Sequence, residues 1–137
     1  KNRNLTNTKF FPAVNNPFEE ISKHDLIVFS SIEPETFGRT VVEALALGKM
    51  VISFDITGPR EILLNFTQYL NNKGVNITAD FFLVEVANSM SLAEKLGFLN
   101  DNPDLISEIT KFSRDFVQEN YNLKETKKRL LENFRTS

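Results

Sequence analysis

The stretch from Ser30 to Gly48, SSIEPETFGRTVVEALALG, decides how this chain folds and where its site lies. It leaves an apolar segment of strand length, passes through a turn that carries Glu35, and enters a helix that carries Glu43. A helix that opens in such a turn presents unpaired backbone N–H groups and a partial positive charge, which suit a phosphate or diphosphate. A carboxylate two turns into the helix suits a pair of sugar hydroxyls. The stretch therefore predicts a site for a nucleotide sugar.

Strands and helices are expected to alternate along the rest of the chain. Three apolar runs of strand length are typical of buried strands in a parallel sheet, and a short strand that ends in a turn is predicted before them. The predicted strands cover residues 8–14, 25–30, 50–54 and 81–86. The predicted helices cover residues 16–24, 36–48, 91–99, 102–118 and 123–134, and a further helix opens at residue 58. Residues 65–80 are expected to be irregular.

This alternation predicts an α/β fold, a Rossmann-like parallel sheet with flanking helices and right-handed crossovers. Ligands of such sheets bind at the carboxyl ends of the strands, which is where the turn that follows Ser30 is expected to lie. A length of 137 residues and a mass of 15.7 kDa fit a single domain over residues 1–137. They are too small for a two-domain enzyme.

Composition excludes several other classes of protein. The formal net charge of −2 gives no general attraction to nucleic acid. No apolar run approaches the ~18 residues of a membrane span, and the absence of cysteine excludes disulfides and thiolate chemistry. No cluster of carboxylates with the one histidine, His24, suggests a metal, and no metal or cofactor is expected. We expect a cytoplasmic protein.

A known family has a similar ordered set of residues. In this chain the set consists of Glu35, Glu43, Gly48 and the segments 49–52 and 55–61. It looks like the C-terminal, donor-binding domain of retaining glycosyltransferases of the GT-B fold, glycosyltransferase family 4 or group 1. The resemblance covers roughly residues 8 to 134. It implies transfer of a sugar from a nucleotide-diphosphate donor to a saccharide or lipid acceptor, in synthesis of bacterial cell-surface polysaccharide or glycolipid.

The resemblance also assigns roles to the two glutamates. Glu35 matches the first glutamate of the family motif, whose side chain lies by the transferred sugar; the alternative is a carboxylate that stabilises a helix dipole by ~0.3–1 kcal/mol. Glu43 matches the glutamate that accepts hydrogen bonds from the two ribose hydroxyls. Its alternative is a solvated surface glutamate, which the apolar side chains around it disfavour.

The turn between them is expected to form the rest of the site. Its four residues form the first turn of the predicted helix and offer backbone N–H groups to the diphosphate: Phe37, Gly38, Arg39 and Thr40. The Phe37 side chain is expected to anchor the core, and the Arg39 side chain is either a phosphate contact or an exposed helical arginine. Val14 matches a strand-end turn that in relatives runs past the nucleotide base. Thr57, Gly58 and Glu61 match a second motif, which helix capping explains more simply.

The chain departs from the family where the family's domain begins. Two strands, a glycine-containing loop and a basic pair for the diphosphate have no match, and the acceptor site belongs to an absent N-terminal domain. We therefore expect a fragment of a longer two-domain enzyme, incomplete on its N-terminal side, with an exposed sheet edge and no turnover of its own. Two alternatives stay open: a non-catalytic nucleotide-sugar-binding module, and an epimerase or phosphorylase of the same architecture.

The basic cluster at residues 124–129 bears on membrane association. It fits a solvated helix face better than a membrane-surface patch, because a glutamate interrupts its cations. Peripheral association of the full-length protein with the inner face of the membrane stays open.

Overall fold

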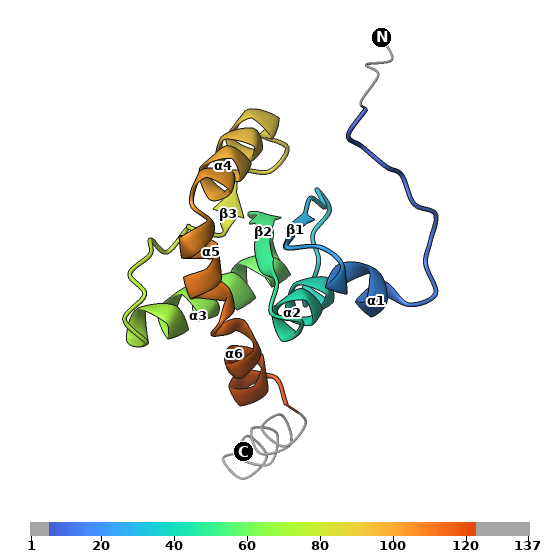
Figure 1. Cartoon of the computed structure of the whole chain (residues 1–137). Coiled ribbons are helices and arrows are strands. Elements are labelled where there is room, and N and C mark those ends of the chain that lie inside the picture. Colours follow the sequence, from blue (N-terminus) through green and yellow to red (C-terminus); the bar gives the residue numbers. More distant parts are fainter. Residues whose placement is uncertain (1–5, 123–137) are drawn as a thin grey trace.

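A computed structural model describes residues 6–122 of the chain and shows a parallel sheet flanked by helices (Figure 1). The three strands lie in the order β1-β2-β3. They are β1 (Leu26–Phe29), β2 (Met50–Phe54) and β3 (Leu83–Val84). Leu26 lies opposite Met50 and Ser53 lies opposite Leu83, so all three strands point the same way. The predicted α/β fold with a parallel sheet is confirmed.

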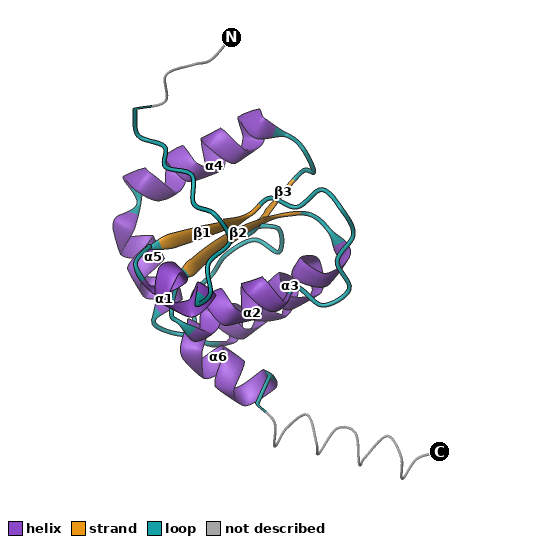
Figure 2. Ribbon diagram, turned by 90° about the vertical axis from the view of Figure 1, so that its right-hand side faces the viewer, coloured by secondary structure: helices purple, strands orange, loops and turns teal. Residues whose placement is uncertain are grey.

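Helices cover both faces of this sheet. They are α1 (Pro17–Ser22), α2 (Arg39–Ala46), α3 (Thr57–Asn72), α4 (Ser89–Asp101), α5 (Pro103–Thr110) and α6 (Ser113–Asn120). Figure 2 shows α4 on one side of the strands and α2 and α3 on the other, with α6 packed beyond them. Among the described residues, no helix is long and apolar enough to cross a membrane.

The core lies between β2 and the helices. Every residue of β2 is buried, as its uninterrupted apolar sequence predicts. Phe66 of α3 stacks on Phe82 with ring centroids 5.3 Å apart and lies 4.9 Å from the ring of Phe116 on α6. These aromatic contacts join the sheet, the crossover helix and the last described helix into one core. β1, at one edge of the described sheet, is only half-buried.

Two predicted helix boundaries are confirmed. The Asn16 side chain accepts a hydrogen bond from the Glu19 N–H, and Pro17 occupies the first position of α1. Gly48 has a φ of +71°, the left-handed conformation that commonly ends a helix, directly after the last turn of α2. Both boundaries could be predicted because asparagine, proline and glycine affect the conformation or hydrogen bonding of the backbone close to them.

One strand prediction is wrong, and another is right in place but too long. Residues 8–14 form no strand, because no neighbouring strand lies beside them within the described part of the chain. Of the run 81–86, only Leu83 and Val84 pair with β2; Val86 is exposed beyond the point where the pairing ends.

Two helix predictions are also wrong. Residues 65–72 continue α3, because Phe66, Thr67 and Leu70 extend its buried face. The single helix predicted over 102–118 is two helices, α5 and α6, which pack on different elements. The helix predicted over 123–134 lies outside the described residues.

Candidate functional site

The N-terminal ends of α2 and α3 meet at the carboxyl edge of the sheet, where the loop that carries Glu35 crosses in front of α3. The Gly58 N–H donates to the Glu35 carbonyl oxygen over 2.8 Å. A Cβ on Gly58 would lie 2.5 Å from that oxygen and 2.8 Å from the Phe37 nitrogen. The loop and the start of α3 therefore touch backbone to backbone, and only glycine at position 58 allows this approach.

Gly38 forms the other half of this contact. It precedes α2 with a φ of +67°, and a Cβ there would lie 2.9 Å from the Pro59 nitrogen and 3.0 Å from the Ile62 Cδ1. Both the conformation and the space exclude a side chain. The predicted helix start at residue 36 is therefore wrong: α2 begins at Arg39, and Phe37 and Gly38 lie in the turn before it.

The sequence predicts that Phe37 anchors the core, and this prediction is wrong. Its side chain is 59% exposed, because the turn ahead of α2 carries it outward from the sheet. Thr40 is half-buried on the first turn of the helix. The Phe37 ring is therefore open to solvent at this turn, while its backbone nitrogen packs against Gly58.

Both helices begin without a side-chain cap within the described part of the chain. The N-cap residues are Gly38 for α2 and Ile56 for α3, and neither supplies a side-chain hydrogen bond. The capping role expected for Thr57 is thus wrong, since Thr57 is already helical. The first N–H groups of an α-helix have no intrahelical acceptor, and the helix dipole gives them a partial positive charge. At the start of α3, however, the Gly58 N–H bonds the Glu35 carbonyl oxygen, Pro59 has no N–H, and the Arg60 N–H bonds the Ile56 oxygen. The start of α2 therefore offers N–H groups to an anion, and the adjoining α3 adds its helix dipole.

Glu43 lies on α2, one turn beyond Arg39, and the two side chains form an ion pair. The Arg39 Nε donates to Glu43 Oε1 over 2.7 Å. The Arg39 side chain is 79% exposed and that of Glu43 is 18% exposed. The carboxylate thus lies at the margin of the core, and an exposed guanidinium holds one of its oxygens.

Glu35 is half-buried in the loop that Gly58 fixes against α3. Its backbone is constrained by that contact, while its side chain makes no hydrogen bond to the described residues. Val14 is exposed in the irregular segment that leads into α1 (Figure 1). The structure thus brings residues 35–43 together at the start of α2, and the role of Val14 near the base stays a prediction.

A hollow of about 610 Å³ lies behind the loop, at the end of β2. It is lined by Pro34, Asp55, Ile56, Thr57, Arg60, Glu61 and Leu64. The Arg60 guanidinium bonds both carboxylate oxygens of Asp55, and this hydrogen bonding raises the pKa of Arg60. Sequence reasoning missed this pair, because the bend between β2 and α3 that brings the two side chains together carries no spacing signal of its own.

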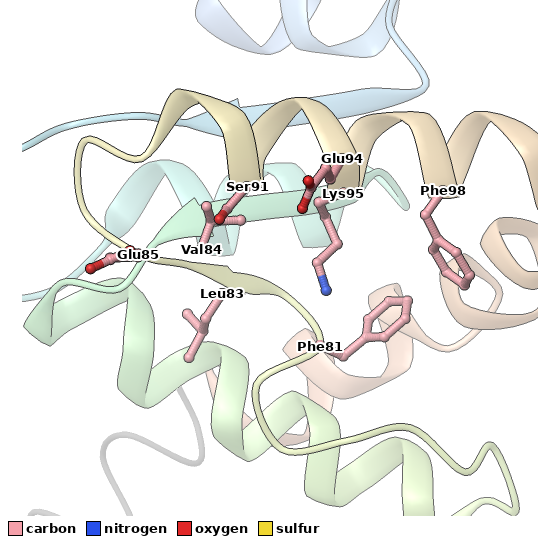
Figure 3. Close-up of a pocket in the computed structure, with 8 residues that line it drawn as sticks. All are labelled: Phe81, Leu83, Val84, Glu85, Ser91, Glu94, Lys95 and Phe98. Carbon is pink, nitrogen blue, oxygen red and sulfur yellow. The ribbon is translucent and has the colours of Figure 1, made fainter.

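A second hollow of about 490 Å³ lies between β3 and α4 (Figure 3). Lys95 Nζ lies 5.0 Å from the centre of the Phe81 ring, and the Phe81 and Phe98 rings meet edge to face. This hollow includes none of the predicted site residues. No group of three or more metal-ligating side chains occurs among residues 6–122. His24 is exposed just beyond the end of α1, with its Nε2 3.4 Å from Glu20 Oε1.

The chain is similar in sequence and in structure to known glycosyltransferases. Residues 1–122 match the family described as glycosyl transferases group 1. A glycosyltransferase structure from Rickettsia africae ESF-5 is 32% identical with a TM-score of 0.63, over 82% of this chain and 27% of that one. Anabaena Alr3699/HepE in complex with UDP is 18% identical with a TM-score of 0.66, over 87% of this chain and 29% of that one. No curated protein matches. The chain therefore spans less than a third of the length of either structure.

Proposed function

Because this chain belongs to the group 1 glycosyltransferases, we propose that it is the donor-binding domain of a retaining enzyme. The donor is a nucleotide-diphosphate sugar, and the acceptor is a saccharide or lipid in the synthesis of bacterial cell-surface polysaccharide or glycolipid. The observation that carries the proposal is the uncapped start of α2 beside the Glu35 loop, one turn from the Glu43 carboxylate. For a lipid acceptor, the reaction belongs at the inner face of the membrane.

The helix ends supply the anion-binding part of the site. The N–H groups of Gly38, Arg39 and Thr40 lie at the open end of α2, and the adjoining start of α3 adds a second helix dipole. Together they bind the diphosphate and stabilise the negative charge that it gains as it leaves. No metal is needed for this role in the proposal.

The two carboxylates hold the sugars on either side of the diphosphate. Glu43 accepts hydrogen bonds from the two ribose hydroxyls, and charge assistance makes these bonds stronger than neutral ones. Glu35 binds hydroxyls of the transferred sugar. The bond from the anomeric carbon to the diphosphate oxygen breaks, the acceptor oxygen bonds to the same face of that carbon, and its proton passes to the leaving diphosphate.

The Anabaena structure, which shares this fold, is a complex with UDP, and a nucleotide ligand for this chain agrees with that. The first nucleotides to test are UDP, GDP, ADP and CMP.

Calorimetric titration of the full-length natural protein with these four nucleotides tests the proposal. We expect one of them to bind, and Glu43→Gln to weaken that binding at least about tenfold, because the amide loses the charged acceptor. Glu108→Gln is the matched control, since Glu108 is an exposed glutamate on α5. Unchanged affinity in Glu43→Gln, with the fold intact by circular dichroism, would contradict the ribose role.

A further inference from the structure

The ion pair between Arg39 and Glu43 carries an inference that rests on the proposed function and deepens it. We propose that Arg39 is a positioning residue: it holds the Glu43 carboxylate in the orientation that meets the ribose hydroxyls, and so sets the preference for ribose over deoxyribose. The Arg39 Nε to Glu43 Oε1 distance of 2.7 Å is that of a strong charge-assisted hydrogen bond.

Helix stability does not account for an arginine at this position. Arg39 is the first residue of α2, where the positive end of the helix dipole disfavours a cation. An acidic residue followed four positions later by a basic one is the more stabilising order, and here the order is reversed. The Arg39 side chain is also largely exposed, and exposed pairs add little to stability. We therefore attribute to the pair an effect on the orientation of the Glu43 carboxylate.

Glu43 is the member of the pair whose orientation matters. Its side chain is mostly covered, so the pair fixes a carboxylate at the margin of the core. Each carboxylate oxygen has two lone-pair sites, so Oε1 can accept from Arg39 while both oxygens still accept from ligand hydroxyls. A carboxylate already held in place loses less conformational freedom when the ligand binds, which strengthens binding.

The planar guanidinium suits this role better than an ammonium would. Its N–H groups point in fixed directions, and Nε alone occupies the carboxylate in this structure. A lysine at position 39 keeps the charge and loses this fixed direction. Arg39→Lys therefore separates charge from geometry, and Arg39→Met removes both while it keeps an apolar stem.

The experiment compares ribonucleotides with their 2′-deoxy counterparts in the full-length natural protein. Calorimetry gives the Kd ratio for UDP against 2′-deoxy-UDP, GDP against 2′-deoxy-GDP, ADP against 2′-deoxy-ADP, and CMP against 2′-deoxy-CMP. We expect the wild type to prefer the ribonucleotide, and Arg39→Met to lower that preference about fivefold. Arg39→Lys should restore part of it. Arg39→Met added to Glu43→Gln should produce no further loss.

Arg114→Met is the matched control, because Arg114 lies at the opposite end of α2, where it donates to the Leu47 carbonyl oxygen. It should leave the ribose preference unchanged. Equal weakening of the ribo and deoxyribo nucleotides in Arg39→Met would mean that Arg39 contacts the diphosphate, and would overturn the positioning role. An unchanged or larger preference would overturn it as well.

These measurements distinguish a failure of the role of Arg39 from a failure of the proposed function. If Glu43→Gln weakens nucleotide binding and Arg39→Met keeps the ribose preference, only the role of Arg39 fails. If none of the nucleotides binds, or Glu43→Gln binds as the wild type does, the proposed function fails and the role of Arg39 fails with it.

Discussion

Glycine at two positions lets the Glu35 loop lie directly on the start of α3. A Cβ at Gly58 would meet three backbone atoms of the loop at 2.5–2.9 Å, and none of these atoms belongs to a flexible side chain. The contact also contains the hydrogen bond from Gly58 to the Glu35 carbonyl oxygen. The position of the Glu35 backbone therefore depends on the lack of a side chain twenty-three positions further along.

Replacement of Gly58 by alanine tests this dependence. We expect Gly58→Ala to displace the loop, to lower nucleotide affinity at least about tenfold, and to cost about 1–3 kcal/mol of unfolding free energy through overpacking. Calorimetry and urea denaturation measure the two effects. Gly97→Ala is the control, because nothing lies within 4 Å of a Cβ in that turn of α4. Alanine there should stabilise by about 0.5–1 kcal/mol. Normal binding by Gly58→Ala would argue against the loop as part of the site.

Among the elements, those with a local signal were predicted well. The buried strand β2 follows from its apolar run, and α1 and the end of α2 follow from residues that act on their own backbone. The C-terminal half of α3 was missed although its buried residues recur at helical spacing, because the asparagines and glutamine between them resemble a loop. The break between α5 and α6 carries no glycine or proline, so tertiary packing alone places it.

The candidate site divides in the same way. Glu35, Glu43 and the helix start between them lie in one continuous segment, so the resemblance to the family motif can be recognised within that segment and points to them. The contact of Gly58 with the loop depends on how two crossovers pack, and no spacing within one segment predicts it. The same holds for Asp55 and Arg60, whose pairing depends on the bend between β2 and α3.

The packing of α6 on the core predicts a large loss of stability when its buried aromatic residue is removed. Phe116 is fully buried against Phe66 and Tyr69, with ring centroids 4.9 Å and 5.5 Å away. Phe116→Ala should cost about 3–5 kcal/mol, since it leaves a cavity among these rings. Urea denaturation measures this loss. Met90→Ala, an exposed position on α4, should change stability by less than about 0.5 kcal/mol. A loss below about 1 kcal/mol in Phe116→Ala would show that α6 is peripheral to the fold.

The link between α3 and α6 predicts a pH dependence. Burial, and then the hydrogen bond to Glu119, raise the pKa of Tyr69 to about 12. The folded protein therefore holds the phenol proton more tightly than the unfolded chain, whose tyrosine pKa is about 10. This contribution is complete below pH ~10 and is lost as the pH rises towards ~12, by about 1–2 kcal/mol after allowance for solvent screening.

Tyr69→Phe isolates this contribution. Urea denaturation from pH 9 to 11.5, followed by circular dichroism, should show a steeper fall in stability for the wild type than for Tyr69→Phe above pH ~10. Parallel curves for the two proteins would mean that the phenol proton is not linked to folding.

For the whole molecule, the parallel strand order matters most, because it brings the starts of α2 and α3 to one edge of the sheet. A net charge of −2 gives no overall attraction to a diphosphate, so the affinity has to come from this local arrangement. The chain covers 27% and 29% of the two glycosyltransferase structures that it resembles. The residues of this chain therefore test the donor-binding part of the proposed function.

The most direct test is a crystal structure of the full-length natural protein with the nucleoside diphosphate that binds it most tightly. We predict diphosphate oxygens within about 2.7–3.2 Å of the N–H groups at the start of α2, and both ribose hydroxyls on the Glu43 carboxylate. A nucleotide bound elsewhere, such as in the hollow between β3 and α4, or with its ribose away from Glu43, would contradict this prediction.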